Sequence, residues 1–204
     1  MDPRLSSPAA RRNRDPILAV LRRVLPAEGA VLEVASGSGE HAVWLAAHLP
    51  GLVFQPSDPE PASRASISAW IAHEAPPNVR APLALDASDE DWALPAEIAA
   101  RLVAVLCINM GHVAPWQATL GLLRGAGRLL RSGGVLYLYG PYKREGRHTA
   151  PSNAAFDASL RARDPESGVR DLEDVVAAAG RAGLTLASVE EMPANNLSAI
   201  FRKT

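Results

Sequence analysis

The chain has 204 residues, the length of one ordinary domain, and we expect a single domain over residues 1–204. Hydrophobic residues make up 48% and charged residues 21%, which excludes general disorder. The formal net charge of -1 argues against nucleic-acid binding through bulk electrostatics, so we expect no nucleic-acid partner. Cys107 is the single cysteine, which excludes a disulfide framework and a cysteine-rich metal site, and we expect no metal.

The sequence carries no sign of membrane insertion or secretion. Its longest clean apolar run, residues 102–108, is far shorter than the ~20 residues that a membrane helix needs. The first 15 residues lack the apolar segment of a signal peptide. We therefore expect a cytoplasmic protein with no membrane partner, either a monomer or a homodimer.

The first predicted elements are an N-terminal arm over residues 1–12 and a helix that begins at Asp15-Pro16, an acid followed by proline at the first helical position. Pro26 and Gly29 end this helix. Further helices are expected at residues 40–49, from about 60 to 74, at 115–131 and at 170–182. Strands are expected at residues 30–34, 52–54, 79–85, 102–109, 135–139, 184–189 and 197–202.

Strands that alternate with helices and read as apolar runs predict a parallel sheet covered on both faces. The last two strands are joined by the short segment 192–196, so they must run antiparallel. This order predicts an α/β, Rossmann-like fold with a seven-stranded, mostly parallel sheet and a C-terminal antiparallel hairpin. It is the topology of the class I methyltransferases, which use S-adenosyl-L-methionine.

A glycine loop follows the first strand, in the run from Glu33 to His41. Glycines let the backbone turn tightly and admit a ligand where a Cβ would block it. The methyltransferase pattern of an acid and three spaced glycines is matched, except that an alanine replaces the first glycine. Glycine-rich turns also serve packing alone. The candidate cofactor residues in this loop are Glu33, Ala35, Gly37, Gly39 and His41.

Two acids follow the next strands. Asp58 ends the second strand and could accept hydrogen bonds from both hydroxyls of a ribose, although Asp58-Pro59 is also good turn chemistry. Asp86 ends the third strand, where this fold commonly contacts the adenine, and it could equally be a helix N-cap.

After the fourth strand come Asn109 and His112, our candidate catalytic residues. Asn109 offers an amide donor and a carbonyl acceptor and could also contact the cofactor, and His112 can take a proton near neutral pH. The alternative for His112 is a hydrogen-bonded structural role, which is as common for a histidine in such a position as a catalytic role.

Residues 141–169 form a polar insertion after the fifth strand, which we interpret as a lid or a substrate-recognition element. A solvated connection with one short helix at 154–163 is the alternative. Candidate substrate-binding residues in and around the insertion are Tyr139, Lys143, His148, Asn153, Arg161 and Asn195. This inventory favours a small polar or anionic acceptor.

Several blocks resemble an uncharacterised, methyltransferase-like family of bacteria and animals, a domain of unknown function similar to methyltransferase-like protein 26. They include the runs 12–18, 32–41, 55–58, 109–116, 136–143, 152–163 and 192–197. The resemblance spans nearly the whole chain and implies the class I fold and binding of adenosylmethionine. It implies no particular substrate.

The leading hypothesis is therefore an adenosylmethionine-dependent methyltransferase that acts on a small-molecule substrate. A dinucleotide-dependent oxidoreductase is the alternative enzyme, because Gly37, Gly39 and Ala42 with a downstream Asp58 also fit a Rossmann fingerprint. A non-catalytic binding protein that keeps the fold is the third reading.

Overall fold

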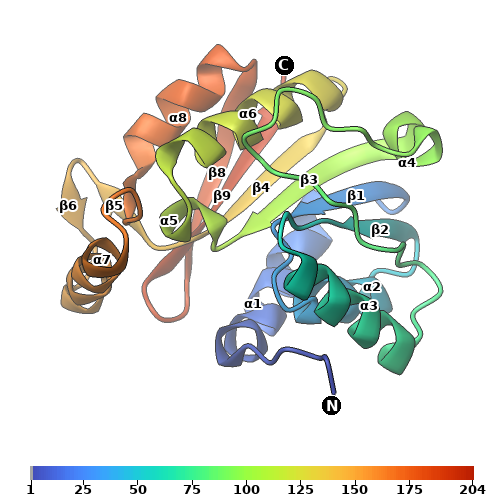
Figure 1. Cartoon of the computed structure of the whole chain (residues 1–204). Helices are drawn as coiled ribbons and strands as arrows, with labels where there is room; N and C mark the ends of the chain where they lie inside the picture. The colour runs from blue at the N-terminus through green and yellow to red at the C-terminus, as the bar shows by residue number, and fades with distance from the viewer. Residues whose placement is uncertain (1) are drawn as a thin grey trace. The chain divides into compact units, whose positions relative to one another are not determined.

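The computed structural model describes residues 2–204 (Figure 1). These residues divide into two compact units, one up to Asp86 with Trp92–Leu106, the other Ala87–Asp91 with Cys107–Thr204. No helix of the described residues is both long and apolar enough to cross a membrane.

The first unit contains a parallel strand pair and the helices around it. Its elements are α1 (Pro8–Val24), β1 (Gly29–Val34), α2 (Glu40–His48), β2 (Leu52–Pro56), α3 (Pro61–Glu74), α4 (Ala96–Arg101) and most of β3 (Leu102–Ile108). β1 pairs in parallel with β2. β1 is buried along its whole length, as expected for a strand covered on both faces. The carboxyl ends of β1 and β2 therefore lie together.

The first helix begins earlier than the sequence predicts. α1 starts at Pro8, where the Ser7 hydroxyl accepts a hydrogen bond from the Ala10 backbone N–H. Pro16 lies inside this helix, where it lacks the N–H that would continue the ladder. The expected start at Asp15-Pro16 is thus wrong, because Ser7-Pro8 carries the same cap-and-proline signal one segment earlier.

The expected third strand, residues 79–85, is not a regular strand. The segment follows β2 through isolated bridges, Phe54 to Val79 and Ser57 to Leu83. Prolines explain the interruption, because neither Pro56 nor Pro82 has the backbone N–H that a continuous ladder requires. The main sheet thus has six strands instead of the seven expected.

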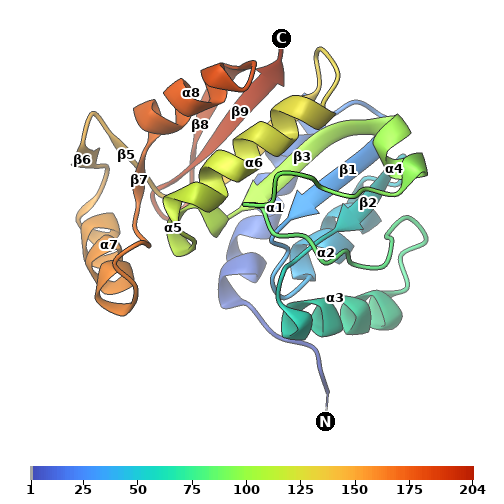
Figure 2. The same ribbon diagram turned by 45° about the horizontal axis from the view of Figure 1, so that its top comes forward.

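The second unit contains an antiparallel sheet region flanked by two long helices. Its elements include α5 (Met110–Val113), α6 (Trp116–Leu129), β4 (Val135–Gly140), α8 (Leu172–Arg181), β8 (Leu184–Met192) and β9 (Asn196–Lys203). β9 runs antiparallel to both β4 and β8 and lies between them, which confirms the predicted antiparallel hairpin. Figures 1 and 2 show α6 and α8 side by side, and the two helices pack against each other.

Neighbouring strands of the main sheet follow the order β2-β1-β3-β4-β9-β8. The insertion after β4 folds into a helix, α7 (Pro151–Arg163), and a small sheet of three short strands in the order β6-β5-β7. The strands are β5 (Tyr142–Arg144), β6 (Arg147–His148) and β7 (Arg170–Asp171). The short helix expected at 154–163 is confirmed and begins slightly earlier. That the insertion acts as a lid stays a prediction.

Candidate functional site

The glycine loop of the first unit adopts a left-handed backbone at three alternate positions. Ala35 has φ 57°, Gly37 has φ 57° and Gly39 has φ 90°. A Cβ at Gly39 would lie 2.8 Å from the Ile67 Cα of α3, so this glycine is required for helix packing. A Cβ at Gly37 would meet no atom within 4 Å. The loop therefore has open space beside Gly37, as a ligand-binding loop needs.

Asp58 lies directly after β2 and is tied to this loop. Its Oδ2 accepts a hydrogen bond from the Gly37 backbone N–H at 2.9 Å, and its Oδ1 accepts one from the Glu60 N–H at 3.0 Å. Asp58 is buried. Because each carboxylate oxygen has two acceptor sites, Asp58 can still accept hydrogen bonds from a ligand.

Glu33, at the carboxyl end of β1, is a buried acid with an unpartnered oxygen. Only 2% of its surface is exposed, and its Oε2 has no hydrogen-bond partner within the described structure. Burial raises the pKa of Glu33 to about 7; a hydrogen bond with Ser36 opposes the shift and the Asp58 charge adds to it. A buried carboxylate oxygen without a partner is costly, and such a group suits a positively charged ligand.

His41, a predicted cofactor residue, is held by the first helix. Its Nε2 lies 2.7 Å from Oδ1 of Asn13, a buried residue of α1. Burial, with a smaller contribution from the Arg14 charge, lowers the pKa of His41 to about 4, so its ring is neutral at pH 7. The Arg14 guanidinium stacks over the Trp44 ring at 3.7 Å from the centroid. This arrangement fastens α1 to α2.

The structure thus brings Glu33, Gly37 and Asp58 together at the carboxyl ends of β1 and β2. Ala35 and Gly39 shape the same loop, and His41 opens the helix that follows it. Asp86, the predicted adenine contact, is exposed in an irregular segment. Asp86 is the last residue of the first continuous stretch of chain in the first unit.

In the second unit, Asn109 and His112 lie around Gly140. Asn109 has φ 68°, and its backbone N–H donates to the Tyr139 carbonyl at 2.8 Å. A Cβ at Gly140 would lie 3.1 Å from the His112 Nδ1 and 3.8 Å from the Asn109 Oδ1. Because Gly140 has no Cβ, the side chains of Asn109 and His112 can both lie against it. The two predicted catalytic residues are thus close to the same backbone position.

His112 is buried and neutral. Burial, with a smaller contribution from the Arg170 charge, lowers the pKa of His112 to about 4. Its ring meets the Phe156 ring of α7 edge-on, with centroids 5.3 Å apart. Phe156 and the neighbouring Val113 are both large exposed apolar residues, at 37% and 52%. The imidazole is thus neutral at pH 7 and lies beside an exposed apolar rim.

Three predicted substrate residues converge on one carboxylate, that of Asp157 in α7. Its Oδ1 accepts from the Arg161 Nε at 3.1 Å, and its Oδ2 lies 3.3 Å from the His148 Nε2 and 3.6 Å from the Lys143 Nζ. The Val169 N–H also donates to Oδ1 at 2.7 Å. Although burial opposes the shift, these donors and charges hold the pKa of Asp157 below its usual value.

The other predicted substrate residues lie elsewhere in the second unit. Asn153 donates through its amide to the Asn195 carbonyl at 2.8 Å, which joins α7 to the turn between β8 and β9. Tyr139 is only 3% exposed and lines a small interior void with Cys107 and Thr119.

Sequence reasoning missed Asp157, Phe156 and Gly140 as site residues. The four-residue spacing from Asp157 to Arg161 on a helix was a readable signal for one of the Asp157 contacts. Nothing local indicates the approach of Phe156 or Gly140 to His112, because both contacts depend on tertiary packing. Among residues 2–204, no group of three or more His, Cys, Asp and Glu side chains could hold a metal ion.

Residues 4–203 match the model of a family described as "Protein of unknown function (DUF938)". Among solved structures, the chain is similar to the S-adenosylmethionine-dependent methyltransferase SibL in its apo form, with 23% identity and a TM-score of 0.76. It is also similar to human N-acetylserotonin methyltransferase in complex with SAM, with 14% identity and a TM-score of 0.78. A third similar structure is an O-methyltransferase family protein from Burkholderia thailandensis, with 18% identity and a TM-score of 0.76.

Each of these matches covers 96% of this chain but only 55%, 52% and 57% of the respective neighbour. The chain thus spans about half the length of these proteins. At such identities the likeness shows the fold alone, which is the class I methyltransferase fold that the sequence predicts.

Proposed function

The chain belongs to the DUF938 family of proteins of unknown function, and we propose that it is an S-adenosyl-L-methionine-dependent methyltransferase acting on a small polar acceptor. The observation that carries the proposal is the buried, unpartnered Oε2 of Glu33 at a glycine loop that is tied to Asp58. The fold of the neighbours supports the same reading.

The residues of the first unit fit this cofactor. Gly37 leaves open space at the loop, and Asp58 keeps acceptor sites for ribose hydroxyls. Glu33 offers a buried carboxylate to a positive charge, and a cation beside it would favour its ionised form. When bound, adenosylmethionine supplies an activated methyl group on a sulfonium. The protein contributes by binding and orienting the reactants and by excluding water.

On the acceptor side, His112 takes the proton that the acceptor loses and Asn109 orients the acceptor through its amide. His112 is neutral at pH 7, so a ring nitrogen can accept the proton, although burial makes its imidazolium less favourable than that of an exposed histidine. Lys143, His148 and Arg161 act together through Asp157 to hold α7, whose Phe156 contacts His112. Asn153, Asn195 and Tyr139 position the insertion and the end of β4.

The test of this role is methyl transfer to sets of small phenols, hydroxy acids and amines, followed as release of adenosylhomocysteine. His112→Gln should lower kcat by about 10²–10⁴-fold, the usual contribution of a general base. His73→Gln changes an exposed histidine of α3 and is the matched control. Equal turnover in His112→Gln and the wild type would remove His112 as the base.

A cytoplasmic location, a monomeric or homodimeric state, and the likeness to methyltransferase-like protein 26 remain predictions. So does the single domain with a lid at 141–169.

A further inference from the structure

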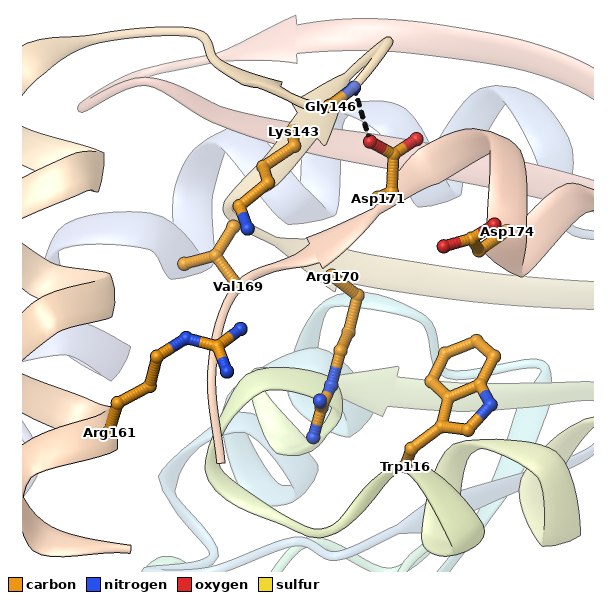
Figure 3. Close-up of a pocket in the computed structure, with 8 residues that line it drawn as sticks. All are labelled: Trp116, Lys143, Gly146, Arg161, Val169, Arg170, Asp171 and Asp174. Carbon is orange, nitrogen blue, oxygen red and sulfur yellow. Dashed lines mark hydrogen bonds between the residues drawn. The ribbon is translucent and has the colours of Figure 1, made fainter. Parts of the chain in front are cut away.

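The second unit contains an open cavity of about 380 Å³ between the insertion and the starts of α6 and α8. Figure 3 shows the side chains that line it, from both sides of the space. Its charged and aromatic lining residues are Trp116, Lys143, Arg161, Arg170, Asp171 and Asp174. Asn109, His112 and Tyr139 are not among the lining residues, so this cavity is separate from the proposed methyl-transfer residues.

One side of the cavity is cationic. The Arg161 Nε is bound to Asp157, but within the described structure its two terminal nitrogens have no hydrogen-bond partner, and 46% of the side chain is exposed. Lys143 lies only loosely against the same carboxylate, at 3.6 Å. Figure 3 shows both side chains directed from the same side into the cavity. A planar guanidinium with two free nitrogens is suited to bidentate binding of a carboxylate or a phosphate.

Arg170 adds positive charge to the cavity, and two of its three guanidinium nitrogens already donate hydrogen bonds to backbone carbonyls. Its Nε donates to the Gly111 carbonyl, and one terminal nitrogen donates to the carbonyls of Ala114 and Glu166. Its guanidinium lies 5.9 Å from the centroid of the Trp116 ring. Arg170 therefore fixes the wall of the cavity through Nε and one terminal nitrogen, and its other terminal nitrogen can add to the ligand binding of Arg161 and Lys143.

The opposite side is acidic. Asp171 accepts backbone hydrogen bonds from Gly146 and Glu173, one on each carboxylate oxygen, and caps α8. Asp174, one turn further along α8, is exposed and has no hydrogen bond or ion pair within the described structure. Figure 3 shows it on the same side of the cavity as Trp116 and across from Arg161. A free carboxylate beside an aromatic ring is suited to an ammonium group.

We propose that this cavity binds a small zwitterion, whose carboxylate or phosphate pairs with Arg161 and Lys143 and whose ammonium group pairs with Asp174 beside Trp116. The acids of α8 would repel a simple anion, and the arginines would repel a simple cation. Only a ligand that carries both charges is attracted to both sides of the cavity. The volume lies within the range of small-molecule sites. The inference does not depend on methyl transfer.

The test is isothermal titration of the full chain, without cofactor, against four probes. Phosphoethanolamine is a zwitterion with a phosphate and β-alanine is one with a carboxylate, whereas inorganic phosphate is only anionic and ethanolamine only cationic. We expect one zwitterion to bind with 1:1 stoichiometry and at least about 10-fold more tightly than either single-charge probe. Whichever zwitterion binds more tightly identifies the anionic group.

Three variants locate the binding. Arg161→Gln and Asp174→Asn should each weaken zwitterion binding about 10-fold or more, and Asp174→Asn should not weaken phosphate binding, because it removes a negative charge. Asp174→Asn tests the site without disturbing Asp157. Arg163→Gln, on the same helix but outside the cavity lining, is the control and should bind like the wild type. The proposal is wrong if neither zwitterion binds, if a single charge suffices, or if Arg163→Gln weakens binding as much as Arg161→Gln.

Discussion

The backbone N–H of Gly37 donates a hydrogen bond to Oδ2 of Asp58 at 2.9 Å. This contact joins the loop after β1 to the end of β2, and a further backbone bond from Ser36 to the Ser57 carbonyl, at 2.8 Å, supports it. These two hydrogen bonds therefore fix the position of Gly37, with the open space beside it, relative to the Asp58 carboxylate. Under the proposed function, both residues would contact the cofactor.

Removal of the Asp58 carboxylate should weaken cofactor binding. We expect Asp58→Ala to cost ~1–3 kcal/mol of binding free energy, because it removes charge-assisted hydrogen bonds. Asp15→Ala, an exposed acid of α1, is the control for a lost surface charge. Titration with adenosylmethionine measures both variants, with circular dichroism to verify folding. Unchanged affinity in folded Asp58→Ala would place the ribose contact elsewhere.

Alanine at Gly37 and at Gly39 should have different consequences. At Gly37 the new Cβ meets no atom, so the free energy of unfolding should fall only by the ~1 kcal/mol that a left-handed alanine costs. The new methyl group would, however, enter the space proposed for the ligand. At Gly39 the Cβ collides with the α3 backbone, so we expect a larger loss of stability. Thermal melts and titration with adenosylmethionine separate the two effects. If Gly37→Ala binds as well as the wild type, the open space is not the ligand site.

Glu33 should make the protein less stable as the pH rises. Burial raises its folded pKa from 4.5 to about 7, so the native state binds the proton more tightly than the unfolded state. The free energy of unfolding should then fall between pH 4.5 and pH 7, by on the order of 3 kcal/mol. Glu33→Gln stays neutral and lacks this fall, so it should gain stability over the wild type at pH 8 and lose adenosylmethionine affinity.

Denaturant unfolding at pH 5 and pH 8 measures this difference. His41 and His112 are present in both proteins, so their own titration cancels in the comparison. Identical pH dependence in the wild type and Glu33→Gln would mean that Glu33 ionises without cost in the fold.

Asp157 should contribute far more to the stability of the insertion than an exposed acid contributes to the stability of its own segment. Asp157→Asn removes a buried carboxylate from the cationic side chains of Lys143 and Arg161 and from the His148 ring, and it should cost about 3 kcal/mol. Because the folded pKa of Asp157 is lowered, its stabilising contribution is present above the ordinary Asp pKa and is lost as the pH falls through the folded value.

Hydrogen exchange of residues 142–170 measures this effect, and it should become faster in Asp157→Asn. Asp91→Asn is the control, since Asp91 forms a surface ion pair with Arg128 and its own side chain is 92% exposed. Equal exchange in the wild type and Asp157→Asn would show that the insertion is held by other contacts.

Much of the fold was readable from local signals. Apolar runs placed β1, β3 and β4, and the short segment between the last strands required the antiparallel hairpin. The relation of Gly37 to Asp58 was also predictable, because residues after two neighbouring parallel strands meet at one edge.

What escaped prediction depends on tertiary contacts or on competing local signals. The start of α1 was wrong because two cap-and-proline signals occur in succession, and only packing selects the first. Placement of His41 required knowing that Asn13 already lies within that helix. Asp157 read as one more surface acid, since the strands that bring Lys143 and His148 to it are only two and three residues long.

The most direct measurement of the central claim is isothermal titration of the full chain with adenosylmethionine, adenosylhomocysteine and NAD. The proposed function predicts saturable 1:1 binding of adenosylmethionine and adenosylhomocysteine, lost in Gly37→Ala, and no binding of NAD. Binding of NAD alone would contradict the proposal in favour of an oxidoreductase, and binding of none of the three would leave a protein that keeps the fold without the cofactor.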